Sequence, residues 1–202
     1  KLKSRLNQAM GEHLQIFKFI FVGSIKGKFS SLFKKIQNIN ENHGPFEAII
    51  CPGSLFGGNY DEWPHILSGQ IKCPIPMLVL GPQNTEEIRF YENTDHANFS
   101  GLIAPEICSL GSNGVHVTSS GLRIAFMSFS NLKTGGWGIC PENTHLISEY
   151  VKNATNFIGV DFFVTPVWPT GILNWVRPSH MPKELTAENG HPWVEFGHPT
   201  ID

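Results

Sequence analysis

Short polar stretches follow three apolar segments of this sequence, and each begins at a glycine. They are Gly-Ser-Ile-Lys-Gly at 23–27, Gly-Ser at 53–54 and Gly-Pro-Gln-Asn at 81–84. Hydrolytic chemistry at such strand ends uses carboxylates or imidazoles, because these groups bind metal ions or move protons. The stretches here hold hydroxyl, amide and ammonium groups instead. The sequence therefore predicts a site placed as in a hydrolase but without its reactive side chains.

Ser24 and Ser54 are the candidate nucleophiles in these stretches. A serine nucleophile needs an adjacent base, and no pairing of either serine with a histidine is evident. We therefore expect both hydroxyls to satisfy backbone groups of their loops. Lys26, Lys28 and Asn84 are the side chains that could contact a phosphate group of RNA, against the plainer interpretation of the lysines as solvated residues at a helix start.

Hydrophobic periodicity predicts the elements that position these stretches. Continuous apolar, β-prone runs indicate buried strands at 17–22, 48–51 and 74–80. Apolar spacings of three and four indicate a helix over 29–40, ended by His-Gly-Pro at 43–45. Later strands are predicted at 107–110, 115–118, 122–128 and 160–164, with a further helix at 145–157. The alternation predicts an α/β fold with a mixed sheet, and such folds place their sites at the carboxyl ends of strands.

Composition favours one globular domain with no strongly basic surface. The 202 residues are 41% hydrophobic and 16% charged, with a formal net charge of -2. Four scattered cysteines form no C-x-x-C pair, which argues against a zinc knuckle and favours a reducing, intracellular compartment. The apolar run at 17–22 is too short to span a bilayer. We expect no membrane association, no metal and no cofactor.

The order of the three loops resembles the calcineurin-like metallophosphoesterase fold. Its signatures are Gly-Asp-x-His-Gly, Gly-Asp and Gly-Asn-His-Glu, followed by later histidines, and its Asp, His and Asn ligands hold two metal ions that activate water. The positions that match these ligands are Ser24, Lys26, Ser54, Pro82, Gln83 and Pro166. None is a good metal ligand, and the ammonium of Lys26 would repel a cation. The resemblance implies an α/β sandwich of mixed β-sheets flanked by helices, with a degenerate metal site and no catalytic residue.

Longer phrases resemble one branch of that superfamily, the CwfJ-type splicing factors associated with the lariat debranching enzyme. The phrases are GSIKGKF (23–29), FEAIICPGSLFG (46–57), PIPMLVLGPQN (74–84), GVHVTSSGLRIAFMS (114–128) and GVDFFVTPVWPTGI (159–172). They imply a metallophosphoesterase-like domain over 17–172, with a leader at 1–16 and an unassigned extension at 173–202. The resemblance also implies a nuclear, non-catalytic role in pre-mRNA splicing or intron-lariat turnover. The implied partners are the debranching enzyme or late spliceosome proteins, with RNA as a further partner.

Two other classes of function stay open. One is an active phosphodiesterase or ribonuclease that uses non-standard ligands, for which the candidates are Asp61, Asn84, His96 and His116. The other is a plain RNA-binding module. A metal site from His191, Glu195 and His198 is disfavoured, because the two histidines lie seven residues apart, which fits no standard spacing.

Aromatic residues in the loops suggest a surface for a protein partner. Tyr60, Trp63 and Trp137 stand among glycines, where aromatic side chains often mark an interface. Trp168, between two prolines, is expected to pack in the core. The adjacent acids Asp61 and Glu62 are expected to form a solvated loop tip.

Overall fold

The part of the chain that the structure describes folds into two β-sheets and a set of helices. The computed structural model describes residues 16–91, 94, 100–128, 149, 159–166 and 176–177. In chain order the elements are β1 (Phe19–Phe21), α2 (Phe29–His43), β2 (Ala48–Cys51), α3 (Trp63–Leu67), β3 (Met77–Val79), the 3-10 helix η1 (Thr85–Tyr91), β4 (Gly101–Ala104), β5 (Ile107–Ser109), β6 (Asn113–Val117), β7 (Arg123–Met127) and β8 (Phe162–Val164).

The larger sheet is parallel except at one edge. Its order is β1-β2-β3-β5-β4, and only β4 runs antiparallel to its neighbour. The four parallel strands therefore end at the same edge of the sheet. All four residues of β2 are buried, as expected of a central strand covered on both faces.

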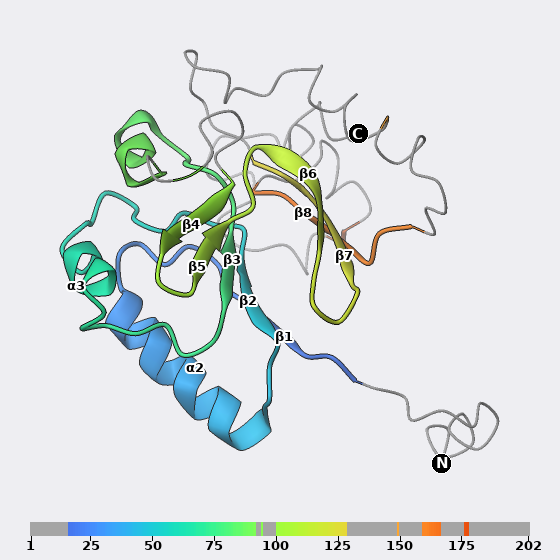
Figure 1. Cartoon of the computed structure of the whole chain (residues 1–202), viewed down its shortest axis with the longest axis horizontal. Coiled ribbons are helices and arrows are strands. Elements are labelled where there is room, and N and C mark those ends of the chain that lie inside the picture. Colours follow the sequence, from blue (N-terminus) through green and yellow to red (C-terminus); the bar gives the residue numbers. More distant parts are fainter. Residues whose placement is uncertain are drawn as a thin grey trace.

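Helices cover one face of this sheet and the second sheet covers the other (Figure 1). Side chains alternate between the two faces along β2, so that Ile49 and Cys51 pack beneath the helices while Ile50 faces the second sheet. The smaller sheet has the order β6-β7-β8, with an antiparallel β6–β7 hairpin and β8 parallel to β7. The result is a mixed α/β fold with two sheets flanked by helices.

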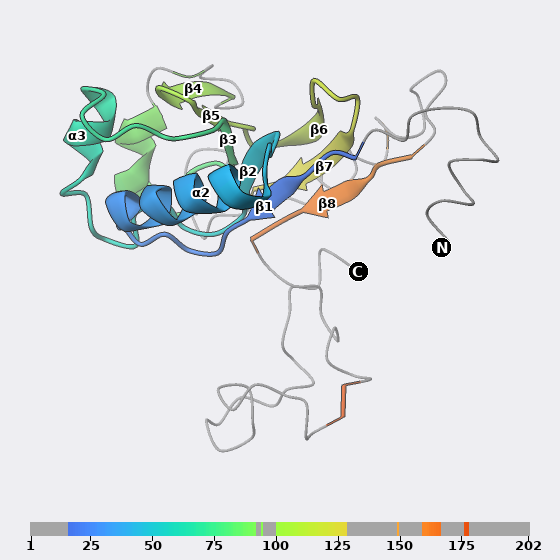
Figure 2. The ribbon, with the colours of Figure 1, turned by 90° about the horizontal axis from the view of Figure 1, so that it is seen from below.

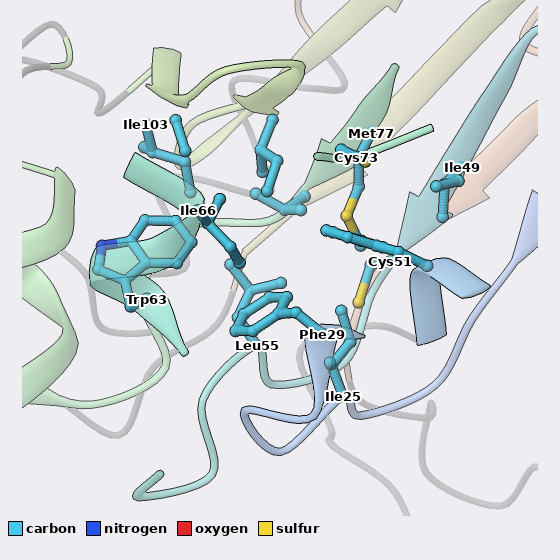
Figure 3. Close-up of a cluster of buried hydrophobic side chains, with 14 of the residues drawn as sticks. Ile25, Phe29, Ile49, Cys51, Leu55, Trp63, Ile66, Cys73, Met77 and Ile103 are labelled. Atoms are coloured by element: carbon cyan, nitrogen blue, oxygen red, sulfur yellow. The ribbon is translucent and has the colours of Figure 1, made fainter. Parts of the chain in front are cut away.

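Aromatic side chains fill the core on the helical side. Three rings contact one another, with centroids 4.9 to 6.1 Å apart. They are those of Phe29 in α2, Phe56 in the loop after β2, and Trp63 in α3. Figure 3 shows Phe29 and Trp63 pointing inward among Leu55 and Ile66. Trp63 is only 2% exposed. Its prediction as an interface residue was therefore wrong, because the segment around it folds back as a short helix that buries the indole.

The two sheets meet through aromatic contacts at β1 and β8, which lie beside each other in Figure 2. The ring of Phe162 in β8 contacts Phe19 and Phe21 of β1, with centroids 6.1 and 5.6 Å apart and edge-to-face geometry. These contacts join the last described strand of the chain to the first.

Most predicted strands are confirmed, with bounds that differ by a few residues. The helix predicted over 29–40 extends to His43, and it ends at the predicted Gly44. Three elements were missed: α3, η1 and β4. The helix predicted at 145–157 lies outside the described residues, apart from position 149. No helix in the described ranges is long and apolar enough to cross a membrane.

The β6–β7 turn is tied to the start of β2 by Glu47. Its carboxylate accepts hydrogen bonds from the Ser119 hydroxyl at 2.9 Å and from the Ser120 backbone N–H at 3.1 Å. Partial burial raises the pKa of Glu47, but hydrogen bonds from Ser120, Ser119 and Thr118 outweigh it, so that the net pKa is lowered.

We predict that this contact makes folding sensitive to acid. A carboxyl whose folded-state pKa is depressed stabilises the fold above its ordinary value of 4.5, and it loses that contribution as the pH falls through the lower folded value. The loss of stability caused by Glu47→Gln in urea denaturation should therefore be larger at neutral pH than well below pH 4.5. When Ser119 is also replaced by Ala, the loss of stability caused by Glu47→Gln should differ less between the two pH values. If Glu47→Gln lowered the free energy of unfolding equally at neutral and at acid pH, the Glu47 carboxylate would not be the source of the acid sensitivity.

We also predict that Trp63→Ala lowers the free energy of unfolding by about 3–5 kcal/mol, because it opens a large cavity in the aromatic core. Leu67→Ala is the matched control, since Leu67 lies in the same helix and is 50% exposed. Its effect should stay within about 0.5 kcal/mol. Equal effects of the two substitutions in urea denaturation would show that the indole is not in the core.

Candidate functional site

The carboxyl ends of β1 and β2 lead into loops that lie in direct backbone contact. A Cβ added to Gly53 would lie 2.6 Å from the backbone nitrogen of Ser24, so only glycine permits this approach. The Ile25 N–H donates to the Ser54 carbonyl at 2.9 Å, and the Gly27 N–H donates to the Leu55 carbonyl at 2.8 Å. The first two polar stretches therefore form one packed unit.

A buried thiol lies directly beneath this unit. The Cys51 sulfur is 3.4 Å from the Gly23 carbonyl oxygen and 3.5 Å from that of Gly53. Burial raises the pKa of Cys51 to about 12, so the thiol stays protonated at neutral pH. Cys51 therefore acts as a small apolar residue with a weak donor.

The buried carboxylate of Glu87 joins the second and third loops. Glu87 belongs to η1 and is only 1% exposed. Its Oε1 accepts from the Ser54 hydroxyl at 3.3 Å and from the Asn84 side-chain amide at 3.0 Å. Its Oε2 accepts from the Gln83 backbone N–H at 2.9 Å. Both oxygens are therefore engaged by groups of the predicted site.

These contacts settle the role of two polar residues. The Ser54 hydroxyl also accepts a hydrogen bond from the Gly57 N–H at 3.0 Å, so it satisfies loop groups as predicted. The Gln83 side chain donates to the Pro52 carbonyl at 3.2 Å, which adds a second link between the loops after β2 and β3. Ser24, in contrast, is exposed.

A buried hydroxyl, that of Ser128, lies at the same edge of the sheet. Ser128 follows β7, accepts from the Gly81 N–H at 2.8 Å and donates to the Gly111 carbonyl at 2.6 Å. It thereby joins the loops after β3 and β5 to the second sheet. Sequence reasoning did not single out Glu87 or Ser128. The only sequence feature that could have indicated them is that each is a polar residue close to the end of a strand or to a loop.

Lys26 of the first stretch and Lys28, which directly follows it, are both exposed. Lys26 has a positive φ of 54°, and Lys28 precedes α2. The first turn of α2 already has an anionic partner, because the Ser30 N–H donates to the Glu62 carboxylate at 2.7 Å. The prediction that Glu62 belongs to a solvated loop tip was wrong: it caps a helix. Its neighbour Asp61 is exposed, as predicted.

The other predicted site positions are distributed between the two sheets. Pro82 is buried in the third loop, whereas Pro166 follows β8 in the smaller sheet. His116 lies in β6, half-buried, and desolvation lowers its pKa. Some predicted residues lie outside the described ranges: His96, Trp137, Trp168, His191, Glu195 and His198.

The residues at this edge do not fit a two-metal centre. Ser54 and Asn84 donate hydrogen bonds to Glu87, and Lys26 carries a positive charge. Glu87 has hard oxygen atoms, but both already accept hydrogen bonds. Within the described residues, no three His, Cys, Asp or Glu side chains gather as a metal site.

We predict that Glu87→Gln lowers the free energy of unfolding by about 1–3 kcal/mol, because a buried amide N–H₂ replaces one of the two accepting oxygens and faces the donors that this oxygen had accepted from. Glu86→Gln is the matched control. Glu86 is the exposed neighbour, it accepts from the Tyr60 hydroxyl, and glutamine can still accept that bond. Its effect should be below about 0.5 kcal/mol in urea denaturation. If Glu87→Gln left the free energy of unfolding unchanged, the carboxylate would not be what holds the loops together.

Comparison with known proteins relates the chain to one group of relatives. A comparison with models of protein families finds no match. The chain is 31% identical over 161 residues, 78% of its length, to CWF19-like protein 1 of Homo sapiens. It is 31% identical over 172 residues to the CWF19-like protein 1 homolog of Drosophila melanogaster. It is also 31% identical over 165 residues to the homolog of Caenorhabditis elegans.

These matches cover most of this chain but a minor part of each relative. The aligned region is 29% of the human protein and 30% of the Drosophila protein. The 202 residues thus correspond to one part of a longer protein in these relatives. By this similarity, the chain belongs to the CwfJ-type family that includes the CWF19-like proteins.

Proposed function

We propose that the chain is a non-catalytic, metallophosphoesterase-like domain that works in pre-mRNA splicing or intron-lariat turnover by binding protein or RNA. The observation that carries the proposal is the Glu87 network. Ser54 occupies a position where the resemblance places a metal ligand, yet its hydroxyl donates to a buried carboxylate, as do the Gln83 N–H and the Asn84 amide.

The proposal follows from what such a network can do chemically. Metal-assisted hydrolysis needs hard donor atoms with free lone pairs that point to a shared centre. Here the convergent groups are hydrogen-bond donors, and their common acceptor is part of the protein. Binding a cation at Glu87 would require breaking these hydrogen bonds to a carboxylate that is only 1% exposed.

The setting in RNA processing rests on the relatives. Their shared name, CWF19-like, supports a role in splicing and therefore a nuclear location. Because the chain spans less than a third of those proteins, the partners of the whole protein are part of the proposal. Binding to the lariat debranching enzyme or to late spliceosome proteins remains a prediction, as do the domain bounds of 17–172.

An active phosphodiesterase is the second candidate. Of its proposed ligands, Asp61 is exposed, Asn84 donates to Glu87, and His116 lies on β6 in the other sheet. A half-buried imidazole with a lowered pKa is neutral at physiological pH and can bind a metal ion, which is the one observation that favours this candidate.

We predict that calorimetric titration with manganese and with zinc detects no binding at micromolar metal, and that neither metal supports cleavage of a 2′,5′-linked branched oligonucleotide. His116→Ala should behave as the wild type in both assays. Stoichiometric uptake of two ions with metal-dependent cleavage would overturn the proposal. If His116→Ala abolished that uptake, the non-standard ligand set would be correct instead.

A further inference from the structure

Three aromatic side chains and one arginine pack against one another between the core and the surface. They are Phe56, Tyr60, Phe90 and Arg89, and they are called the stack below. The rings of Phe56 and Phe90 lie 4.6 Å apart with an angle of 35°, and those of Tyr60 and Phe90 lie 5.2 Å apart at 39°. The Arg89 guanidinium carbon is 5.1 Å from the Tyr60 centroid and 4.8 Å from the Phe90 centroid. Phe56 is fully buried, Tyr60 and Phe90 are half-buried, and Arg89 is exposed.

The geometry leaves the guanidinium available. Packing on two rings holds Arg89 by cation–π contact. Within the described ranges no ion pair or hydrogen bond of Arg89 is seen, so as far as these residues show, its donors are available to a ligand. The Tyr60 hydroxyl donates to Glu86 at 3.0 Å, which fixes the ring that supports the guanidinium.

The stack lies near the exposed lysines. Phe56 and Tyr60 of the stack belong to the loop that follows β2. Gly57 of that loop packs against Lys26, since a Cβ at Gly57 would lie 2.9 Å from the Lys26 Cγ. Lys28 is the N-cap residue of α2, and Glu62, two residues after Tyr60, accepts a hydrogen bond from the first turn of this helix. Lys26 thus contacts the same loop that supplies Phe56 and Tyr60 to the stack, and Lys28 lies at the N-terminus of the helix that Glu62 caps.

The charges beside the stack favour a base over a phosphate as its direct ligand. Glu86 and Asp61 are exposed carboxylates next to Tyr60, and they would repel a phosphate group placed on the stack. A nucleobase is neutral and stacks on aromatic and guanidinium planes. Adenine, cytosine and guanine also carry an amino group that can donate a hydrogen bond to a carboxylate.

We propose that Arg89, supported by Tyr60 and Phe90, is a stacking platform for a nucleobase of single-stranded RNA, with Lys26 and Lys28 near the adjoining phosphates. The inference rests on the proposed function in that it takes RNA as the ligand of this domain. It adds the surface that binds and the part of the RNA that is recognised.

The test is the affinity of the 202-residue chain for a labelled single-stranded oligoadenylate, measured in the presence of a metal chelator. Arg89→Gln should weaken binding at least about fivefold, because stacking contributes on the order of 1–3 kcal/mol per base. Tyr60→Leu should weaken it similarly, whereas Tyr60→Phe should retain most of the affinity. Lys35→Gln is the charge-matched control on the exposed side of α2 and should bind as the wild type.

The salt dependence separates stacking from phosphate contact. Lys26→Gln should reduce the slope of log affinity against log salt by about one, since it removes one phosphate contact. Arg89→Gln should lower affinity at every salt concentration with little change in that slope. An equal loss of affinity in Arg89→Gln and Lys35→Gln would indicate general charge attraction and overturn the platform.

Two other results would also overturn it, and neither depends on the metal assays. If the wild-type chain binds no oligoadenylate, the platform is wrong, while the non-catalytic function still stands on the absence of metal binding and cleavage. If Arg89→Gln binds oligoadenylate normally but loses a complex with purified lariat debranching enzyme, the stack is a protein surface and not a base platform.

Discussion

The loops at the carboxyl edge of the larger sheet depend on one buried carboxylate. Glu87 contributes two oxygens to a region where the backbone has just left its strands and where Ser54, Gln83 and Asn84 all present donors. The carboxylate is only 1% exposed, and a buried charged group without hydrogen-bond partners costs more than the about 1–3 kcal/mol of a neutral one, so it could not be left without these donors. The loop conformations and the carboxylate therefore require each other.

In the function proposed above, these hydrogen bonds hold together the loops that metal ions join in a hydrolytic site. In a two-metal site, cations would bring neighbouring strand-end loops together by taking oxygen and nitrogen ligands from each. Here hydrogen bonds join the same loops: Glu87 links those after β2 and β3, and Ser128 links those after β3 and β5. Lys26 and Arg89 are exposed, and we propose that they contact the RNA partner.

The sheet and the long helix could be predicted from sequence because they rest on local patterns. The buried strand at 48–51 and the apolar spacing of α2 each identify an element without reference to the rest of the chain. The positions of Ser54 and Gln83 at one edge followed from parallel strand order. Glu87 and Trp63 could not be placed in this way, because a carboxylate and an indole in polar, glycine-containing segments have the composition of surface loops. Only the tertiary contacts of η1 and α3 bury them.

The most direct test of the account is a crystal structure of the chain soaked in manganese, with anomalous diffraction used to locate the metal. We predict no anomalous peak among the loops that carry Ser24, Ser54 and Gln83, and a Glu87 carboxylate still within hydrogen-bond distance of Ser54, Asn84 and the Gln83 N–H. Two peaks about 3.5–4 Å apart at that edge, with Glu87 turned toward them, would contradict it.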